Sequence, residues 1–199
     1  IFSGYEGLWL DLTPQELAEK RMQEAAWKES LNNSPERRLT DNWQGDAIKG
    51  QKIINGQINL KQIPDFNNFK FLRDLKSEGS FKARSFARSL IDEWIEQDIN
   101  LRSKVFDSEI MAERVSCWCF NYSWFGESGD FNFQKKVLTS IALQTKFLEL
   151  KLEETKKPND QIIIIKGLLV AKSILYKDIN NIHAMLDIVN DAVDLLINP

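Results

Sequence analysis

The 199-residue sequence contains a single histidine and only two cysteines, Cys117 and Cys119. A structural zinc site generally needs four cysteine or histidine ligands, so no metal site is expected. The two cysteines are two positions apart, and on a helix this spacing points them to different sides, away from disulfide geometry. The glycine-rich signatures of nucleotide binding are absent as well. We therefore expect two small buried apolar residues, no metal and no cofactor.

Long apolar runs and an excess of charge of one sign are also missing. The longest fully aliphatic run, Ile162–Ile165, is far shorter than the roughly 18–20 residues that span a bilayer, which predicts no membrane insertion. With 26 Lys and Arg against 29 Asp and Glu, the net charge is -3, and no global field favours nucleic acid or an anionic membrane. Whether the compartment is cytoplasmic or periplasmic stays open.

Strand-like sequence is nearly absent, and residues 57–61 are the one candidate. Helix signals cover most of the rest. Expected helices occupy about 13–31, 46–54, 66–76, 80–97, 108–125, 131–154, 160–177 and 181–197. The fold class is therefore predicted to be all-α.

The apolar residues of these helices recur at helical spacing. Phe86, Leu90 and Trp94 fall at i, i+4 and i+8, which predicts one buried stripe. A second stripe alternates steps of four and three: Met111, Val115, Trp118, Tyr122 and Phe125. Short polar breaks between the helices favour successive antiparallel helical hairpins, and the lack of a fixed-period repeat favours a toroid or irregular bundle over a regular solenoid.

Two units are expected along the chain. The run Asn32-Asn33-Ser34-Pro35 breaks the first helix, so residues 1–40 are interpreted as a helical arm and linker. Residues 41–199 form the second unit. An apolar helix that ends the chain would leave one flank open, and we expect this unit to be truncated at its C-terminus.

Several short stretches stand in a particular order: Trp43-Gln44-Gly45-Asp46-Ala47 with Gly50 and Gly56, Phe69–Leu75, Trp94, Arg114–Trp118, Ser140–Gln144 with Leu148, and Gly167-Leu168-Leu169. Over residues 43–197 this order resembles the helical N-terminal domain of the heparinase II/III family. The resemblance implies an incomplete α/α toroid. In full-length members a C-terminal β-sandwich domain follows, and the protein cleaves acidic polysaccharides by β-elimination.

β-Elimination next to a uronate carboxylate needs a group that neutralises the carboxylate, a base and an acid. Where many family members have Asn-His, this chain has Asn159-Asp160, and its one histidine, His183, falls in a different helix. Tyr122 and Tyr176 are the helical tyrosines that could donate a proton, but both lie in apolar stripes and are better interpreted as core. The catalytic residues are therefore not identified.

A substrate-binding site is predicted on one side of a helix. Arg114, Trp118 and Asn121 follow i, i+4, i+7 spacing, and Gln144 on the next helix is expected to line the same cleft. Arg offers a fork for a carboxylate or sulfate, and Trp offers a flat face for a pyranose ring. The alternatives are a buried ion pair for Arg114, a core position for Trp118 and a hairpin contact for Gln144. The adjacent pair Arg73-Asp74 is interpreted mainly as a salt bridge.

Two functions follow. The first is the helical domain of a heparinase-like polysaccharide lyase, which binds an acidic polysaccharide and needs a missing C-terminal β-sandwich domain for catalysis. The second is a non-catalytic helical carbohydrate-binding or scaffold protein derived from the same fold.

Overall fold

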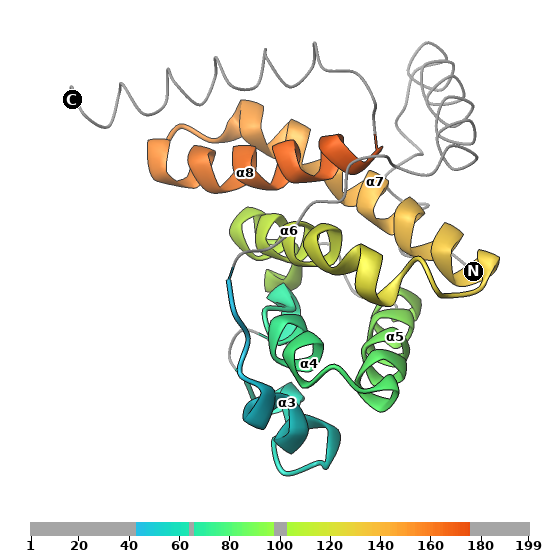
Figure 1. Ribbon diagram of the computed structural model, residues 1–199. Helices are drawn as coiled ribbons and strands as arrows, with labels where there is room; N and C mark the ends of the chain where they lie inside the picture. Colours follow the sequence, from blue (N-terminus) through green and yellow to red (C-terminus); the bar gives the residue numbers. More distant parts are fainter. Residues whose placement is uncertain (1–42, 64–65, 98–102, 176–199) are drawn as a thin grey trace.

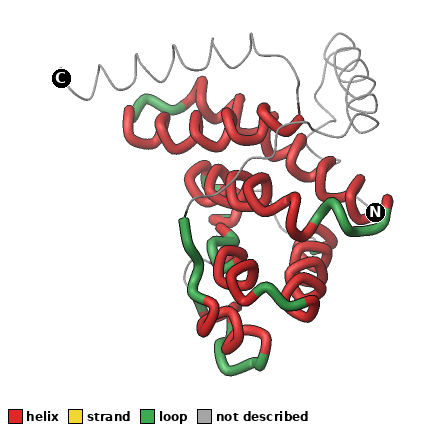
Figure 2. Tube along the Cα trace, viewed as in Figure 1, coloured by secondary structure: helices red, strands yellow, loops and turns green. Residues whose placement is uncertain are grey.

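The computed structural model describes residues 43–63, 66–97 and 103–175, and every regular element in these ranges is helical (Figures 1 and 2). The α-helices are α3 (Ala47–Ile54), α4 (Leu72–Glu78), α5 (Phe81–Glu96), α6 (Ser108–Phe125), α7 (Phe131–Glu154) and α8 (Pro158–Leu175). Three short 3-10 helices complete the described part: η1 (Leu60–Gln62), η2 (Phe66–Asn68) and η3 (Lys104–Phe106). The predicted all-α class is confirmed. The helices expected at 13–31 and 181–197, the arm at 1–40, Tyr176 and His183 lie outside the described residues.

The strand-like interpretation of residues 57–61 is wrong. Residues 57 and 58 form a bend, and residues 60 and 61 already belong to η1. The Asn59 side chain accepts a hydrogen bond of 3.1 Å from Lys61 N, and this local contact stabilises a turn in place of an extended strand.

Helix ends follow from capping residues that the sequence displays. Asp46 caps α3, because its side chain accepts hydrogen bonds from Ile48 N and Lys49 N. Gly79 ends α4 in the left-handed conformation with φ of 79°, which glycine adopts without a steric penalty. Ser80 then caps α5 through a hydrogen bond from Ala83 N.

Helix α6 is central to the arrangement. In Figure 1 it lies between α8 on one side and the group of α3, α4 and α5 on the other, and α7 packs against both α8 and α5. A link of three residues, 155–157, joins α7 to α8 as a helical hairpin. The approach of α8 to α6 is close at Gly167, where an added Cβ would lie 2.9 Å from Ala112 Cα.

The core centres on aromatic rings. Phe69, Trp94 and Trp118 meet edge to face, with ring centroids 5.2 Å apart for Phe69 and Trp118 and 5.5 Å apart for the two indoles. Phe69 adopts φ of 59°, which costs an L-residue about 1–2 kcal/mol. The full burial of its ring offsets that cost.

The stripe predicted on α6 is confirmed, since all five of its members are buried. The stripe predicted on α5 is partly wrong. Its fully buried face consists of Ala83, Ala87, Ile91, Trp94 and Ile95, while Phe86 and Leu90 are half-buried. Small alanines occupy the inner face because α4, α6 and α7 all pack on α5, and larger side chains fit at the flanks.

We predict that Gly167→Ala destabilises the protein. An alanine in a helix interior is normally favoured over glycine by about 1 kcal/mol. Here the new methyl group collides with Ala112, and we expect a net loss of about 1–3 kcal/mol in the free energy of unfolding. Chemical denaturation measures it, and a stabilised variant would contradict the close packing of α6 and α8.

Candidate functional site

Arg114 on α6 lies in the interior with its side chain fully buried. Its Nε donates a hydrogen bond of 2.7 Å to Gln144 Oε1 on α7. One terminal nitrogen donates to Asn67 O and to Val105 O, each at 3.0 Å. Burying a guanidinium is costly unless its N–H groups are satisfied. The chain therefore brings one side chain and two loop carbonyls to this group.

The guanidinium also stacks on an indole. Its central carbon lies 4.2 Å from the centre of the Trp94 ring, within the range of a strong cation–π contact. Trp94 Nε1 donates to Asn67 Oδ1 at 3.1 Å. The segment around η2 is thus held twice, by the Arg114 hydrogen bond to its backbone and by the Trp94 hydrogen bond to its side chain.

Trp118 and Asn121 lie on the same side of α6 as Arg114, and both are fully buried. The Trp118 ring packs against Phe69 and Trp94. Asn121 Nδ2 donates to Cys117 O at 2.8 Å. Within the described part of the chain, Asn121 Oδ1 and Trp118 Nε1 have no hydrogen-bond partner.

Gln144 is buried on α7, and its amide joins two groups. Its Oε1 accepts from Arg114, and its Nε2 donates to Ser140 Oγ at 3.2 Å. The structure therefore brings Arg114, Trp118 and Gln144 together around Trp94, with Asn121 further along α6. These four side chains are buried inside the protein and do not line an open cleft. A substrate contact for them stays a prediction, and the observed contacts are those of a structural polar layer.

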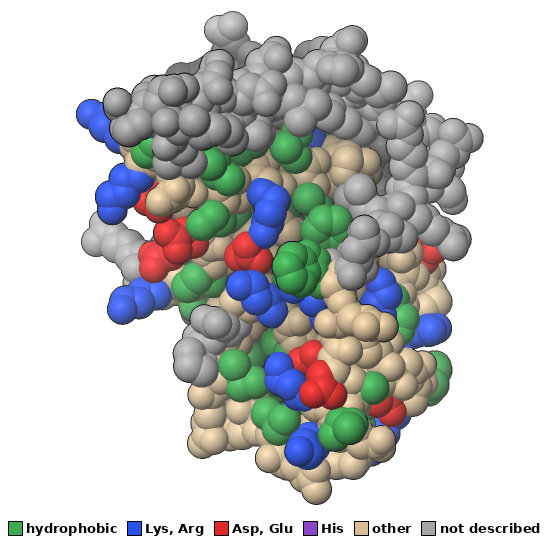
Figure 3. Space-filling view, turned by 60° about the vertical axis from the view of Figure 1, so that its left-hand side comes forward, with side chains coloured by type: hydrophobic (Ala, Val, Ile, Leu, Met, Phe, Trp, Pro, Cys, Tyr) green, Lys and Arg blue, Asp and Glu red, His purple; other side chains and the backbone are tan. Residues whose placement is uncertain are grey.

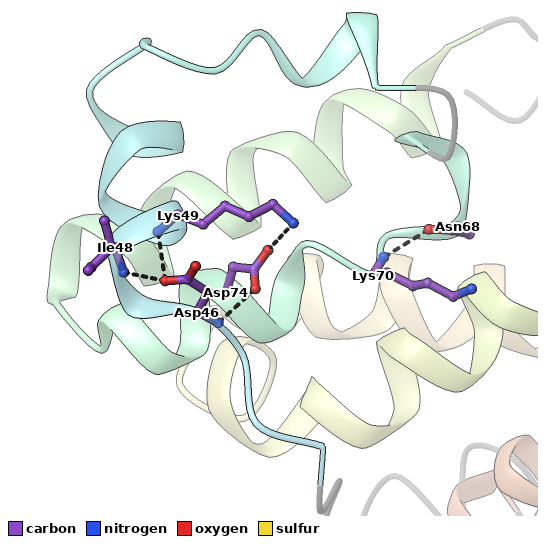
Figure 4. A network of polar contacts seen from close by, with 6 residues as sticks. All are labelled: Asp46, Ile48, Lys49, Asn68, Lys70 and Asp74. Carbon is purple, nitrogen blue, oxygen red and sulfur yellow. Dashed lines mark hydrogen bonds and ion pairs between the residues drawn. The ribbon is translucent and has the colours of Figure 1, made fainter.

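A second polar cluster, which we call the Asp74 clamp, was not recognised from the sequence beyond the Arg73-Asp74 salt-bridge interpretation. Asp74 on α4 is 8% exposed. Its Oδ1 accepts a hydrogen bond of 2.9 Å from Asp46 N, and its Oδ2 lies 2.7 Å from Lys49 Nζ (Figure 4). Gly45 lies directly against the backbone of Arg73, where a Cβ would be 2.1 Å from the carbonyl oxygen.

The Asp74 clamp fixes the start of α3 onto α4. Gly50 repeats the close contact one turn later, against Asp74 O. The sequence signal that could have revealed the Asp74 clamp is the pair Gly45 and Gly50 on either side of the capping Asp46. At both positions the backbone of α4 approaches so closely that only a residue without a side chain fits.

Tyr122 and Cys119 are titratable groups of α6 that are buried in the core. Burial, helped by the charge of Glu127, raises the pKa of the Tyr122 phenol well above its usual range. Burial also raises the pKa of the Cys119 thiol, and both cysteines are buried as predicted and form no disulfide with each other. A phenol and a thiol in this state are poor bases and poor nucleophiles.

No group of three or more metal-ligating side chains occurs among the described residues. None of the described helices is long and apolar enough to cross a membrane.

Comparisons with protein-family models, with curated proteins and with solved structures find no match to this chain.

We predict that Asp74→Ala lowers the free energy of unfolding by about 2 kcal/mol, because it removes a charge-assisted hydrogen bond from a backbone N–H. Asp74→Asn keeps an acceptor and should cost less. Asp92→Asn is the matched control, since Asp92 pairs with Lys136 at the surface and such pairs contribute about 0–1 kcal/mol. Equal losses for Asp74→Ala and Asp92→Asn, measured by urea unfolding, would refute the Asp74 clamp.

We predict a contribution of Tyr122 to alkaline unfolding. Its folded-state pKa is raised, so the stabilisation is complete below the unfolded pKa of about 10 and is lost as pH rises above that value. Tyr122→Phe should lose less stability than the wild type between about pH 9 and about pH 11. Identical slopes of unfolding free energy against pH in the two proteins would contradict the burial of the phenol.

Proposed function

We propose that this chain is the helical domain of a heparinase II/III-like polysaccharide lyase, that its helices belong to an incomplete α/α toroid, and that it binds a uronate-containing polysaccharide. The observation that carries the proposal is the convergence of the stretches on which the resemblance rests. The Asp74 clamp joins the stretch at 43–47 to the stretch at 69–75. Arg114 joins Trp94 to Gln144.

Such convergence supports the family assignment for a physical reason. Residues far apart in the sequence that meet around one buried guanidinium constrain each other, because a change in any of them leaves polar groups unsatisfied. The recurring residues of a fold are expected at such places. The resemblance is therefore supported as a signature of the helical framework, whichever residues carry the chemistry.

We further propose that the chemistry is divided between domains. Abstraction of the proton next to a uronate carboxylate needs a neutralising group, a base and an acid. Among the described residues, Arg114 is engaged by Gln144 and two backbone carbonyls, and Tyr122 is buried as a neutral phenol. In this proposal the helical domain contributes glycan binding, and a C-terminal β-sandwich domain completes the set of catalytic groups.

A second candidate is a non-catalytic helical carbohydrate-binding or scaffold protein derived from the same fold. It is favoured by the sequence Asn159-Asp160-Gln161, which stands where many family members have Asn-His. These residues belong to the first turn of α8, and Gln161 Nε2 donates to Thr155 O at 2.8 Å. This hydrogen bond of Gln161 stabilises the turn between α7 and α8.

The experiment that separates the two candidates begins with the intact mass of the native protein and the reading frame downstream of Pro199. The native protein is then incubated with uronate-containing polysaccharides, and unsaturated uronate ends are followed by ultraviolet absorbance. Formation of these ends supports the lyase. Glycan binding without product formation supports the binding protein, and absence of both binding and cleavage would sink the glycan proposal.

We predict that Arg114→Ala acts first on stability. It leaves Gln144 Oε1 and two loop carbonyls without their donor and opens a cavity beside Trp94, so we expect a loss of about 3–5 kcal/mol in unfolding free energy. Arg114→Lys keeps the charge without the planar fork and should recover part of it. A variant with an unchanged melting temperature but lost glycan binding would restore Arg114 as a substrate ligand and contradict the structural role.

A further inference from the structure

Two arginines on α5, Arg84 and Arg88, lie one helical turn apart, and Arg88 contacts the connection from α6 to α7. Side chains four positions apart share a helix face. Arg88 is anchored there, because its Nε donates to Phe125 O at 2.6 Å and a terminal nitrogen bonds Ser128 Oγ. Its guanidinium is thus fixed against the connection at the end of α6.

Arg84 has no comparable anchor. Its Nε is buried, and among the described residues it has no hydrogen-bond partner. Neither arginine forms an ion pair with a carboxylate in the part of the chain that the structure describes, although eight lysines there do. These lysines are Lys49, Lys61, Lys70, Lys136, Lys146, Lys151, Lys166 and Lys172.

The charges of Arg84 and Arg88 are close enough to act on each other. Burial and the charge of Arg84 lower the pKa of Arg88, and Asp130 acts in the opposite direction. Asp130 caps α7 through a hydrogen bond from Phe133 N, so its carboxylate is already engaged. On the face drawn in Figure 3, basic and acidic side chains are interspersed, so two adjacent arginines without a carboxylate partner differ from that general pattern.

Two exposed aromatic rings accompany the arginines in the chain. Phe81 precedes Arg84 by three positions on α5, and its side chain is 77% exposed. Phe131 begins α7, three residues after Ser128, and is 69% exposed. An acidic glycan presents both matching features, an oxyanion for the guanidinium groups and an apolar sugar face for a ring.

We propose that Arg84, Arg88 and Ser128 form a binding site for the carboxylate or sulfate group of an acidic glycan. The terminal nitrogens of Arg84 and the remaining terminal nitrogen of Arg88 suit both oxyanions, and the Ser128 hydroxyl adds a donor. This site rests on the proposed glycan-binding function, and it replaces the buried Arg114 as the place where the oxyanion is bound.

The test measures binding of a heparin-derived hexasaccharide to the whole chain by titration calorimetry at low salt, with inorganic sulfate as a second probe. Arg84→Gln should weaken hexasaccharide binding about tenfold or more. Arg84→Lys, which keeps the charge but not the fork, should give an intermediate loss. Lys82→Gln is the matched control, since it removes one exposed positive charge two positions away and should change affinity less than about twofold.

The outcomes separate the site from the function. Equal affinities of the wild type and Arg84→Gln, or equal losses in Arg84→Gln and Lys82→Gln, would overturn the site while leaving glycan binding intact. No hexasaccharide binding by the wild type would overturn the glycan function itself. Sulfate binding that depends on Arg84 without hexasaccharide binding would reduce the site to one for small oxyanions and so overturn the glycan assignment. The melting temperature of Arg84→Gln should equal or exceed that of the wild type, because the substitution removes repulsion with Arg88.

Discussion

The buried guanidinium of Arg114 is the constraint on which the described fold depends most. A cation placed in the interior costs several kcal/mol unless its donors are satisfied and its charge is stabilised. Here four separate segments contribute to that stabilisation, through Asn67 O, Val105 O, Gln144 Oε1 and the face of Trp94. The positions of η2, η3, α5 and α7 relative to α6 are thus coupled through one side chain.

The same constraint explains an unfavourable backbone conformation nearby. Phe69 follows η2 with φ of 59°, and its ring enters the space between Trp94 and Trp118. The segment turns sharply because the carbonyl of Asn67 must reach Arg114 while the next aromatic ring enters the core. The strained backbone at Phe69 persists because the hydrogen bond from Arg114 to Asn67 O and the burial of the Phe69 ring both depend on it.

Arg114 and the arginine pair on α5 show that the same residue type can play two different roles in one protein. Arg114 donates to groups of the chain itself, and its surroundings exclude solvent. Arg84 and Arg88 are half-buried on α5, and neither forms an ion pair with a carboxylate among the described residues, although Asp130 is near enough to Arg88 to offset part of the charge. An external anion can therefore gain from the second arrangement, because it removes repulsion that the folded protein otherwise carries.

Much of the fold could be predicted from the sequence, because helix existence and helix ends depend on local chemistry. The caps at Asp46 and Gly79 act through their nearest neighbours in the chain, and the apolar stripe predicted on α6 is buried. The residues 57–61 were misjudged because a single side-chain contact from Asn59 favours a turn over a strand. The inner face of α5 was misjudged because the helices that pack on it decide which side is buried.

The candidate site depended on the tertiary structure in a different way. The spacing of Arg114, Trp118 and Asn121 determined that they share one side of α6, and this is what the structure contains. Whether that side faces a cleft or the interior depends on where α5, α7 and the loops at Asn67 and Val105 pack, which no local pattern encodes. The sequence by itself determined an all-helical chain and its local caps. Only the tertiary structure decided that Arg114 is buried and donates to Gln144 Oε1, Asn67 O and Val105 O, because these contacts join segments that are distant in the sequence.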